Sequence, residues 1–286
     1  MSPVRAEARA KVNLYLHVVG RRADGYHRLD SLIAFADIGD TVAVTAADHL
    51  TLTVDGPTAA LLPADGDNIV EKAARALAGR AGVPAHAAIR LTKRLPVAAG
   101  IGGGSADAAA ALTALSRLWA VDLPRAAMME LALSLGADVP VCLAGRATAL
   151  SGIGEGLDAA PALPPAWLLL VNPMQPCPTP AVFKARQGPF SAPAPLARAP
   201  ADAADLAGEL ARRANDLTEP AIALVPAIGE ALALIAARPG CLLARMSGSG
   251  ATCFGLFADE PEARAAEAAL KAARPAWWSA AARLMG

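Results

Sequence analysis

A glycine-rich turn that leads at once into an alanine-rich stretch constrains this chain more than any other feature. Glycines stand at positions 100, 102, 103 and 104 in the run from Leu95 to Leu112. Glycine lets main-chain N–H groups approach an anion closely, and a following helix adds unpaired N–H groups and the positive end of its dipole. The run therefore predicts a phosphate-binding loop. The alternative for a lone glycine cluster is a turn that only allows helices to pack.

This loop is neither of the two commonest phosphate-binding motifs. No Gly-Lys-Ser/Thr sequence ends it, as in a P-loop, and its glycines miss the G-x-G-x-x-G spacing of dinucleotide-binding folds. The phosphate carrier therefore has to be identified from other residues.

Composition narrows the class of protein. The 286 residues suffice for one large domain or two modest ones, and 26 basic residues balance 26 acidic residues. This balance gives no overall field that favours nucleic acid or an anionic membrane. Four cysteines without a C-x-x-C pair indicate reduced thiols. With no signal peptide and no stretch of roughly 18 apolar residues, we expect a cytoplasmic protein without a membrane partner.

The hydrophobic pattern predicts a mixed α+β chain with two lobes, because strands and helices follow one another without a regular βαβ repeat. Residues 187–204 are rich in proline and alanine and predict an irregular surface loop. We expect strands over 12–19, 41–45, 50–54, 88–92, 167–171, 242–246 and 252–257. We expect helices over 68–81, 105–119, 124–136, 205–214, 221–237 and 262–273.

Four further motifs carry polar groups, and each also has a purely structural interpretation. Lys11 interrupts an apolar strand, where its stem could simply pack. Taken alone, the segment Asp24-Gly-Tyr-His27 is more often a turn than a site, and Asp138 in Gly136-Ala-Asp-Val-Pro140 could equally be the cap of a short helix. Ser247-Gly-Ser-Gly250 could be a plain hairpin turn.

Together these motifs resemble the GHMP kinases, a family of ATP-dependent kinases of small molecules. The resemblance rests on Ala10-Lys-Val-Asn13, the loop Pro96–Ala106, Gly136-Ala-Asp-Val-Pro140 and Ser247-Gly-Ser-Gly250. It implies the two-lobed GHMP kinase fold, with a ribosomal S5 domain 2-like N-terminal lobe over 1–155 and a ferredoxin-like C-terminal lobe over 156–286. It also implies ATP as phosphoryl donor and Mg²⁺ on the ATP phosphates, with no protein ligand assigned to the metal.

A subset of positions implies a particular acceptor. Asp24-Gly-Tyr-His27, Gly152-Ile-Gly-Glu155, Pro178-Thr179 with Phe183, and Asn215-Asp-Leu217 match members that phosphorylate the 2-hydroxyl of a cytidine diphosphate sugar alcohol in non-mevalonate isoprenoid precursor biosynthesis. The alternatives are another GHMP kinase, acting on homoserine, mevalonate or a sugar, and a non-catalytic ligand-binding or RNA-binding module. The resemblance leaves a monomer or a homodimer open.

The resemblance also assigns roles to residues. Lys11 and Asp138 would be catalytic, with Asp138 accepting the proton of the attacking hydroxyl and Lys11 stabilising charge. Tyr26 and Phe183 would stack on the cytosine ring, His27 and Asn13 would hydrogen-bond the base, and Thr179 would complete the acceptor site. The ATP site would comprise Asn68, Lys93, Pro96, Val97, Ala98, Ala99, Gly100, Ile101, Gly102, Gly103, Gly104, Ser105 and Ala106.

Overall fold

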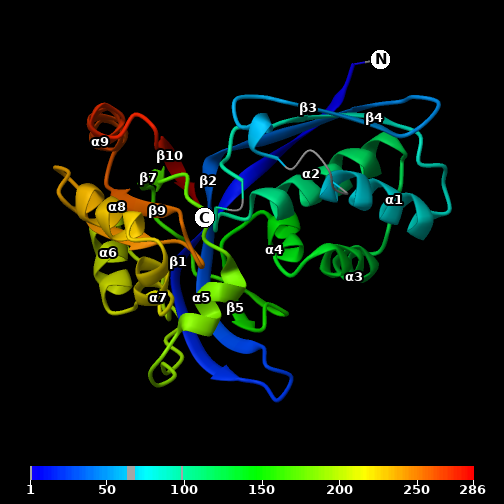
Figure 1. Cartoon of the computed structure of the whole chain (residues 1–286). Helices are drawn as coiled ribbons and strands as arrows, with labels where there is room; N and C mark the ends of the chain where they lie inside the picture. The colour runs from blue at the N-terminus through cyan, green and yellow to red at the C-terminus, as the bar shows by residue number, and fades with distance from the viewer. Residues whose placement is uncertain (1, 63–67, 98) are drawn as a thin grey trace. The chain divides into compact units, whose positions relative to one another are not determined.

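The computed structural model describes residues 2–62, 68–97 and 99–286 (Figure 1). The chain divides into two compact units, each of mixed α/β content and with its own apolar core. Unit 1 comprises Met1–Ala10, Gly39–Val97 and Gly102–Gly145. Unit 2 comprises Lys11–Ile38, Ala98–Ile101 and Arg146–Gly286. These units are not consecutive halves of the chain, and the lobe boundary between residues 155 and 156 stays a prediction.

The sheet of unit 1 is built on the ends of two long paired strands, β1 (Val4–Arg21) and β2 (His27–Thr45). The Thr41–Thr45 end of β2 pairs antiparallel with β4 (Ala88–Thr92). On its other side β4 pairs parallel with β3 (Thr51–Asp55). Valine, leucine and isoleucine alternate along these segments, and their buried side chains form one face of the unit 1 core.

Helices cover the core of unit 1, and the short 3₁₀ turn η1 (Ala59–Leu61) follows β3. The covering helices are α1 (Ile69–Ala81), α2 (Gly103–Leu118), α3 (Arg125–Leu135) and α4 (Val139–Ala144). The central helix is α2, which packs against α1, α3 and α4 (Figure 1). Its buried surface consists largely of alanine, including residues 108–111. Because alanine has a small side chain, neighbouring helices approach α2 closely from several sides.

The sheet of unit 2 is antiparallel. Central strand β7 (Trp167–Asn172) pairs with β9 (Cys253–Phe257) and β10 (Trp278–Met285), and β9 pairs with β8 (Leu243–Met246). The first part of β2 pairs with β5 (Thr148–Gly152) and, at residues 35 and 36, with β10. Strand β6 (Gly156–Ala159) pairs antiparallel with β5 and forms a hairpin with it.

Within the described residues, unit 2 has five helices: α5 (Thr179–Ala185), α6 (Ala203–Ala211), α7 (Thr218–Leu224), α8 (Ala227–Ala236) and α9 (Glu260–Ala273). Aspartate side chains cap two of them, since Asp202 accepts the N–H of Asp205 and Asp259 accepts the N–H of Glu262. No helix among the described residues is both long and apolar enough to cross a membrane.

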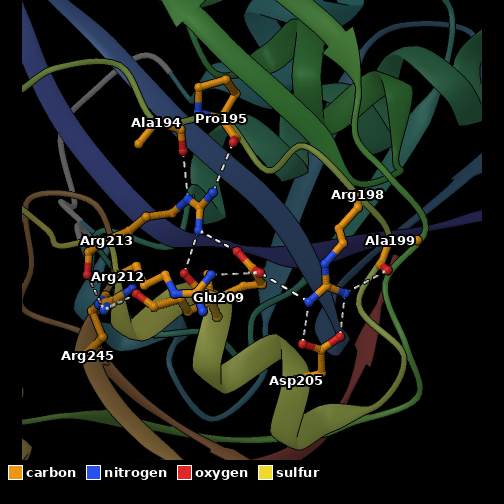
Figure 2. Close-up of polar contacts among 10 residues, drawn as sticks. Ala194, Pro195, Arg198, Ala199, Asp205, Glu209, Arg212, Arg213 and Arg245 are labelled. Atoms are coloured by element: carbon orange, nitrogen blue, oxygen red, sulfur yellow. Dashed lines mark hydrogen bonds and ion pairs between the residues drawn. The ribbon is translucent and has the colours of Figure 1, made fainter.

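The segment predicted to be irregular over 187–204 is irregular as far as residue 202, and α6 begins at Ala203. Many contacts hold its central residues (Figure 2). Arg213 donates from Nε to the carbonyl of Ala194 (2.6 Å) and from Nη2 to that of Pro195 (2.9 Å). Asp30 on β2 accepts the N–H of Ala194 at 2.6 Å. Arg198 forms a two-pronged pair with Asp205 on α6. The segment therefore has a fixed path without regular secondary structure.

Several sequence expectations need correction. The helix expected over 221–237 is two helices, α7 and α8, because Pro226 cannot donate the hydrogen bond that would continue α7. Strand β2 starts at His27, well before residue 41, and β10 was not anticipated at all. Helix α2 begins at Gly103 and not at Ser105, so two of the loop glycines lie in its first turn.

Candidate active site

The glycine loop ends in an uncapped helix N-terminus. The N-cap of α2 is Gly102, with φ at +64°, and it has no side chain to accept the N–H groups of the first turn. Gly103 is half-buried and Gly104 is exposed. Buried Leu95 and Ile101 anchor the chain around the turn. Ala98 lies outside the described residues. The first turn of α2 presents backbone N–H groups without a capping side chain, and such groups suit an anion.

Gly103 and Gly104 are not needed for the backbone path of the helix. Both lie in α2, and neither has a positive φ. A Cβ added at Gly103 would come no closer than 3.8 Å to another atom, and one at Gly104 no closer than 3.9 Å. Glycine in a helix costs stability relative to alanine. Its presence at both positions therefore fits a surface kept free for a ligand to approach the main chain.

Gly100, by contrast, is required by a close backbone contact. Its φ is +73°, and a Cβ there would collide with the carbonyl group of Gly250 and the carbonyl oxygen of Ser247. Two further hydrogen bonds fix this part of the loop, from the N–H of Thr252 to the carbonyl of Ala99 (3.1 Å) and from that of Lys11 to the carbonyl of Ile101 (3.0 Å). The turn Ser247-Gly-Ser-Gly250, the second glycine motif, thus holds the glycine loop in place.

The turn Ser247-Gly-Ser-Gly250 joins β8 to β9, as the hairpin alternative predicted, but it is a buried turn with organised polar groups. Asn215 donates from Nδ2 to the carbonyls of Met246 and Gly248, each at 2.8 Å. Ser247 Oγ accepts the N–H of Asn13 and donates to the carbonyl of Gly100. A plain connecting hairpin would be exposed, so this turn has a structural task in the site.

Lys11 and Asn13 lie next to each other on β1. Lys11 Nζ donates to Asn13 Oδ1 at 3.0 Å, and Asn13 Nδ2 donates to Ser31 Oγ at 2.8 Å. Both side chains are nearly buried. Lys11 is therefore not a surface lysine whose stem packs while its ammonium reaches solvent. Asn13 orients the ammonium group, and its predicted hydrogen bond to cytosine stays a prediction.

Asp138 occupies the N-cap position of α4, but its side chain accepts no hydrogen bond from that helix. The capping interpretation of this aspartate is therefore wrong. The carboxylate is half-buried in unit 1. Its pairing with Lys11 in catalysis stays a prediction.

The predicted acceptor residues lie in unit 2. His27, the first residue of β2, stacks on Phe183 of α5 with 5.0 Å between ring centroids and 21° between planes. Tyr26 is 64% exposed, so it is not a core residue. Thr179, the first residue of α5, shares a hydrogen bond of 2.7 Å with Ser249. The structure thus joins His27 to Phe183, and Thr179 to the second glycine motif.

The environment of His27 favours a neutral imidazole. Burial lowers the pKa of His27 below 6.5, and the positive charges of Arg21 and Arg186 lower it further. A neutral imidazole has one donor and one acceptor nitrogen, which is the combination needed to read the edge of a base.

Asn68 and Lys93, both predicted to lie in the ATP site, have clear structural roles. Asn68 is the N-cap of α1, where Oδ1 accepts the N–H of Val70 at 2.9 Å. Lys93 is 2% exposed, and its ammonium contacts the carboxylates of Asp40 and Asp107. The contact of Asn68 with adenosine stays a prediction, and so does that of Lys93, whose ammonium is held by two buried carboxylates.

Sequence reasoning did not assign roles to Ser247, Asn215 or Asp40. The first two belong to motifs that the resemblance contains, so the signal was present without a function. The role of Asp40 had no local signal, because its partners Lys93, Arg94 and Leu95 are distant in sequence.

Comparisons with known proteins show the family to which this chain belongs. The family model for the GHMP kinases N terminal domain matches residues 68–146, and that for the GHMP kinases C terminal matches residues 197–276. A 4-diphosphocytidyl-2-C-methyl-D-erythritol kinase of Paramagnetospirillum magneticum is 64% identical over 100% of both chains. One of Rhodospirillum rubrum is 61% identical over 97% of this chain and 91% of its own. The chain belongs to the GHMP kinases.

Solved structures show the same fold. A crystal structure of a 4-(cytidine 5'-diphospho)-2C-methyl-D-erythritol kinase aligns over 99% of both chains, with a TM-score of 0.80 and 35% identity. A homoserine kinase from Cytophaga hutchinsonii aligns over 100% of this chain and 95% of its own, with a TM-score of 0.72 and 17% identity. At that low identity the second likeness concerns the fold alone.

Proposed function

We propose that this protein transfers the γ-phosphoryl group of ATP to the 2-hydroxyl of 4-diphosphocytidyl-2-C-methyl-D-erythritol, a step in isoprenoid precursor biosynthesis. The observation that carries the proposal is full-length identity of 61–64% to two relatives of that name. The stacked pair His27–Phe183 supports it, because a flat stacking surface beside a neutral imidazole suits a cytosine ring.

The N–H groups at the start of α2 bind the ATP phosphates. The uncapped first turn and the open space at Gly103 and Gly104 support this role. Mg²⁺ accompanies the phosphates and supplies charge neutralisation. The loop offers N–H donors, which bind phosphate rather than metal, so phosphate oxygens and water are the ligands we expect.

Asp138 accepts the proton of the attacking hydroxyl, and Lys11 stabilises the negative charge of the transferred group. The bond between the γ-phosphorus and the bridging oxygen breaks, a new bond forms to the acceptor oxygen, and ADP leaves. Because phosphoryl transfer has a loose transition state, placing the hydroxyl matters as much as deprotonating it. The hydrogen bond from Lys11 to Asn13 fixes the ammonium for that purpose.

Tyr26 and Phe183 provide the aromatic surfaces for the base, and Thr179 lies at the start of the same helix as Phe183. An exposed tyrosine and a half-buried phenylalanine that already stacks on His27 support this assignment. Polar groups paired with cytosine would be left unpaired by another base, so the selectivity for the base would be high.

ADP release with a set of acceptors tests the proposal. The purified protein should consume ATP with 4-diphosphocytidyl-2-C-methyl-D-erythritol and much less with homoserine, mevalonate or galactose. Turnover with one of the latter and none with the cytidine compound would assign the chain to another GHMP activity. A protein that turns over ATP with none of them, yet binds RNA, would support the non-catalytic alternative.

A further inference from the structure

A buried lysine joins the two ends of the glycine loop. Lys93 directly follows β4, Asp40 lies on β2 and Asp107 lies on α2, and all three are 0–3% exposed. Lys93 Nζ donates to Asp107 Oδ2 at 2.7 Å and also contacts Asp40 Oδ2. Burying three ionisable groups is costly unless they are paired, so this cluster needs a specific reason to exist.

Asp40 fixes the segment that leads into the loop. Its Oδ1 accepts the N–H of Leu95 at 2.9 Å and that of Arg94. The hydroxyl of Thr58 donates to the carbonyl of Leu95 at 2.8 Å. Residues 93–95, immediately before Pro96, therefore have one defined path.

Asp107 fixes the helix that leads out of the loop. It lies on α2 just beyond the first turn, and its Oδ1 has no hydrogen-bond partner among the described residues. The bond from Lys93 to Oδ2 is therefore the interaction that compensates for burial of this carboxylate. Removing it would leave a buried carboxylate unpaired.

The ammonium also lies beside the first turn of α2. A Cβ built on Gly103 would be 3.8 Å from Lys93 Nζ. A positive charge there adds to the positive end of the helix dipole and offsets the charge of Asp40 and Asp107, which would otherwise repel phosphate.

We propose that Lys93, in place of the expected contact with adenosine, is a positioning residue for ATP, which acts through Asp40 and Asp107. It ties the two ends of the loop together, so that the N–H groups of Gly103 and Gly104 keep the direction that phosphate needs. This inference rests on the proposed phosphate-binding role of the loop.

The test compares Asp107→Ala with Asp107→Asn. The asparagine keeps an oxygen for Lys93, whereas the alanine removes it. The dissociation constant of ATP should rise roughly 10-fold or more in Asp107→Ala and return to within about threefold of wild type in Asp107→Asn. The KM of the acceptor should not change in either. Lys271→Met, which removes an exposed ion pair with Glu267 on α9, is the control and should change neither constant.

A second variant tests the proposal even if Asp107→Ala does not fold. Lys93→Gln combined with Asp107→Asn keeps polar groups of similar size but removes the positive charge beside α2. We expect this double variant to fold and to bind ATP roughly 10-fold more weakly. Wild-type ATP affinity in the folded double variant, or an equal loss of ATP and acceptor affinity, would overturn the inference.

Gly103→Val, measured in the same ATP-binding assay, distinguishes the positioning role of Lys93 from the phosphate-binding role of the loop. Loss of ATP binding in Gly103→Val with normal binding in the Lys93 and Asp107 variants would overturn the positioning role alone. Normal ATP binding in Gly103→Val would remove the phosphate-binding role of the loop itself.

Discussion

His27 and Phe183 form a stacked pair, with the imidazole lying on the phenyl ring at a centroid separation of 5.0 Å. One residue opens β2 and the other lies on α5, so the pair joins the strand and helix that bear most of the proposed acceptor residues. One face of Phe183 is occupied by His27, and the exposed ring of Tyr26 is the more accessible surface for the base.

Truncating either aromatic ring should weaken acceptor binding. Tyr26→Ala and Phe183→Ala should each raise the KM of the cytidine substrate by roughly 5- to 150-fold, because a stacking face is worth about 1–3 kcal/mol per base. The KM of ATP should stay within about twofold. Steady-state kinetics with each substrate varied in turn makes the measurement.

Thermal unfolding of the same variants distinguishes a pocket from a core. Tyr26→Ala should leave the melting temperature unchanged because the ring is 64% exposed, whereas Phe183→Ala should lower it, because Phe183 packs on the unit 2 core. Normal acceptor kinetics in both variants would remove the physical basis for cytidine specificity.

Removing the carboxylate of Asp138 should stop the reaction and spare the fold. Asp138→Asn should reduce kcat by about 10²-fold or more, as is typical for loss of a positioned proton acceptor. The fold should be retained, because asparagine keeps the size of the side chain and the aspartate does not cap α4. Wild-type turnover at saturating substrates would show that Asp138 is not catalytic.

A bulky side chain in the first turn of α2 should block ATP without disturbing the backbone. Gly103→Val should abolish measurable ATP binding, since the Cβ and its methyl groups would occupy the space next to the N–H groups. Gly103 has helical geometry, so backbone strain is not the cause. The matched control is Gly79→Val on α1, where an added Cβ meets nothing within 4 Å. Equilibrium titration with ATP gives both constants.

Stability should depend on pH through Asp107. Burial raises the pKa of Asp107 from 3.8 to about 7, with Asp40 adding to the rise and Lys93 opposing it. Between these pH values the folded protein binds the proton that the unfolded chain has lost, so the contribution of Asp107 to stability falls as pH rises from about 4 to about 7. Above that range it is constant.

Denaturant unfolding of wild type and Asp107→Asn, at several pH values from 5 to about 8, tests this sign. Wild type should lose stability relative to Asp107→Asn as pH rises to 7, because the asparagine does not titrate. A difference that stays constant over this range would show that Asp107 is already ionised at the lower pH.

The irregular segment 187–204 should depend on Arg213. This arginine is 8% exposed in its side chain and donates to the carbonyls of Ala194 and Pro195 (Figure 2). Arg213→Gln should lower the free energy of unfolding by about 1.5–3 kcal/mol, the range for a hydrogen bond to a charged group, and increase proteolytic cleavage within the segment. Arg212→Gln is the control, because that side chain is 76% exposed and its ion pair is worth about 0–1 kcal/mol. Equal stability of the two variants would contradict the assignment.

Local sequence signals predicted the elements that depend on local physics. Asn68 caps α1 as its position before an amphipathic run indicates, and the proline at position 226 could have placed the break between α7 and α8. Strand β10 could not be found in this way. Its alanine-rich sequence has little strand propensity, and it becomes a strand because β7 and β2 supply hydrogen-bonding partners.

The residues of the site also fall into those that local sequence predicts and those that it does not. Motifs identified the residue types, including Lys11, Asp138 and the glycine loop, because the chemistry of each is written in a short segment. The partners of Lys93 and Asn13 could not be read from the sequence. Asp40 reaches Lys93 only because β2 pairs with β4, and Ser31 reaches Asn13 only through the register of β1 on β2.

Because Gly100 contacts the turn at Gly250, the two distant motifs can change in evolution only together. A side chain larger than hydrogen at position 100 requires a compensating shift at Ser247 and Gly250, so neither motif can drift by itself. Chimeric kinases would test this directly. A chimera that takes the first motif from one parent and the second from another should work only where both parents share this backbone contact. Recombination between relatives should therefore keep or lose the two motifs together.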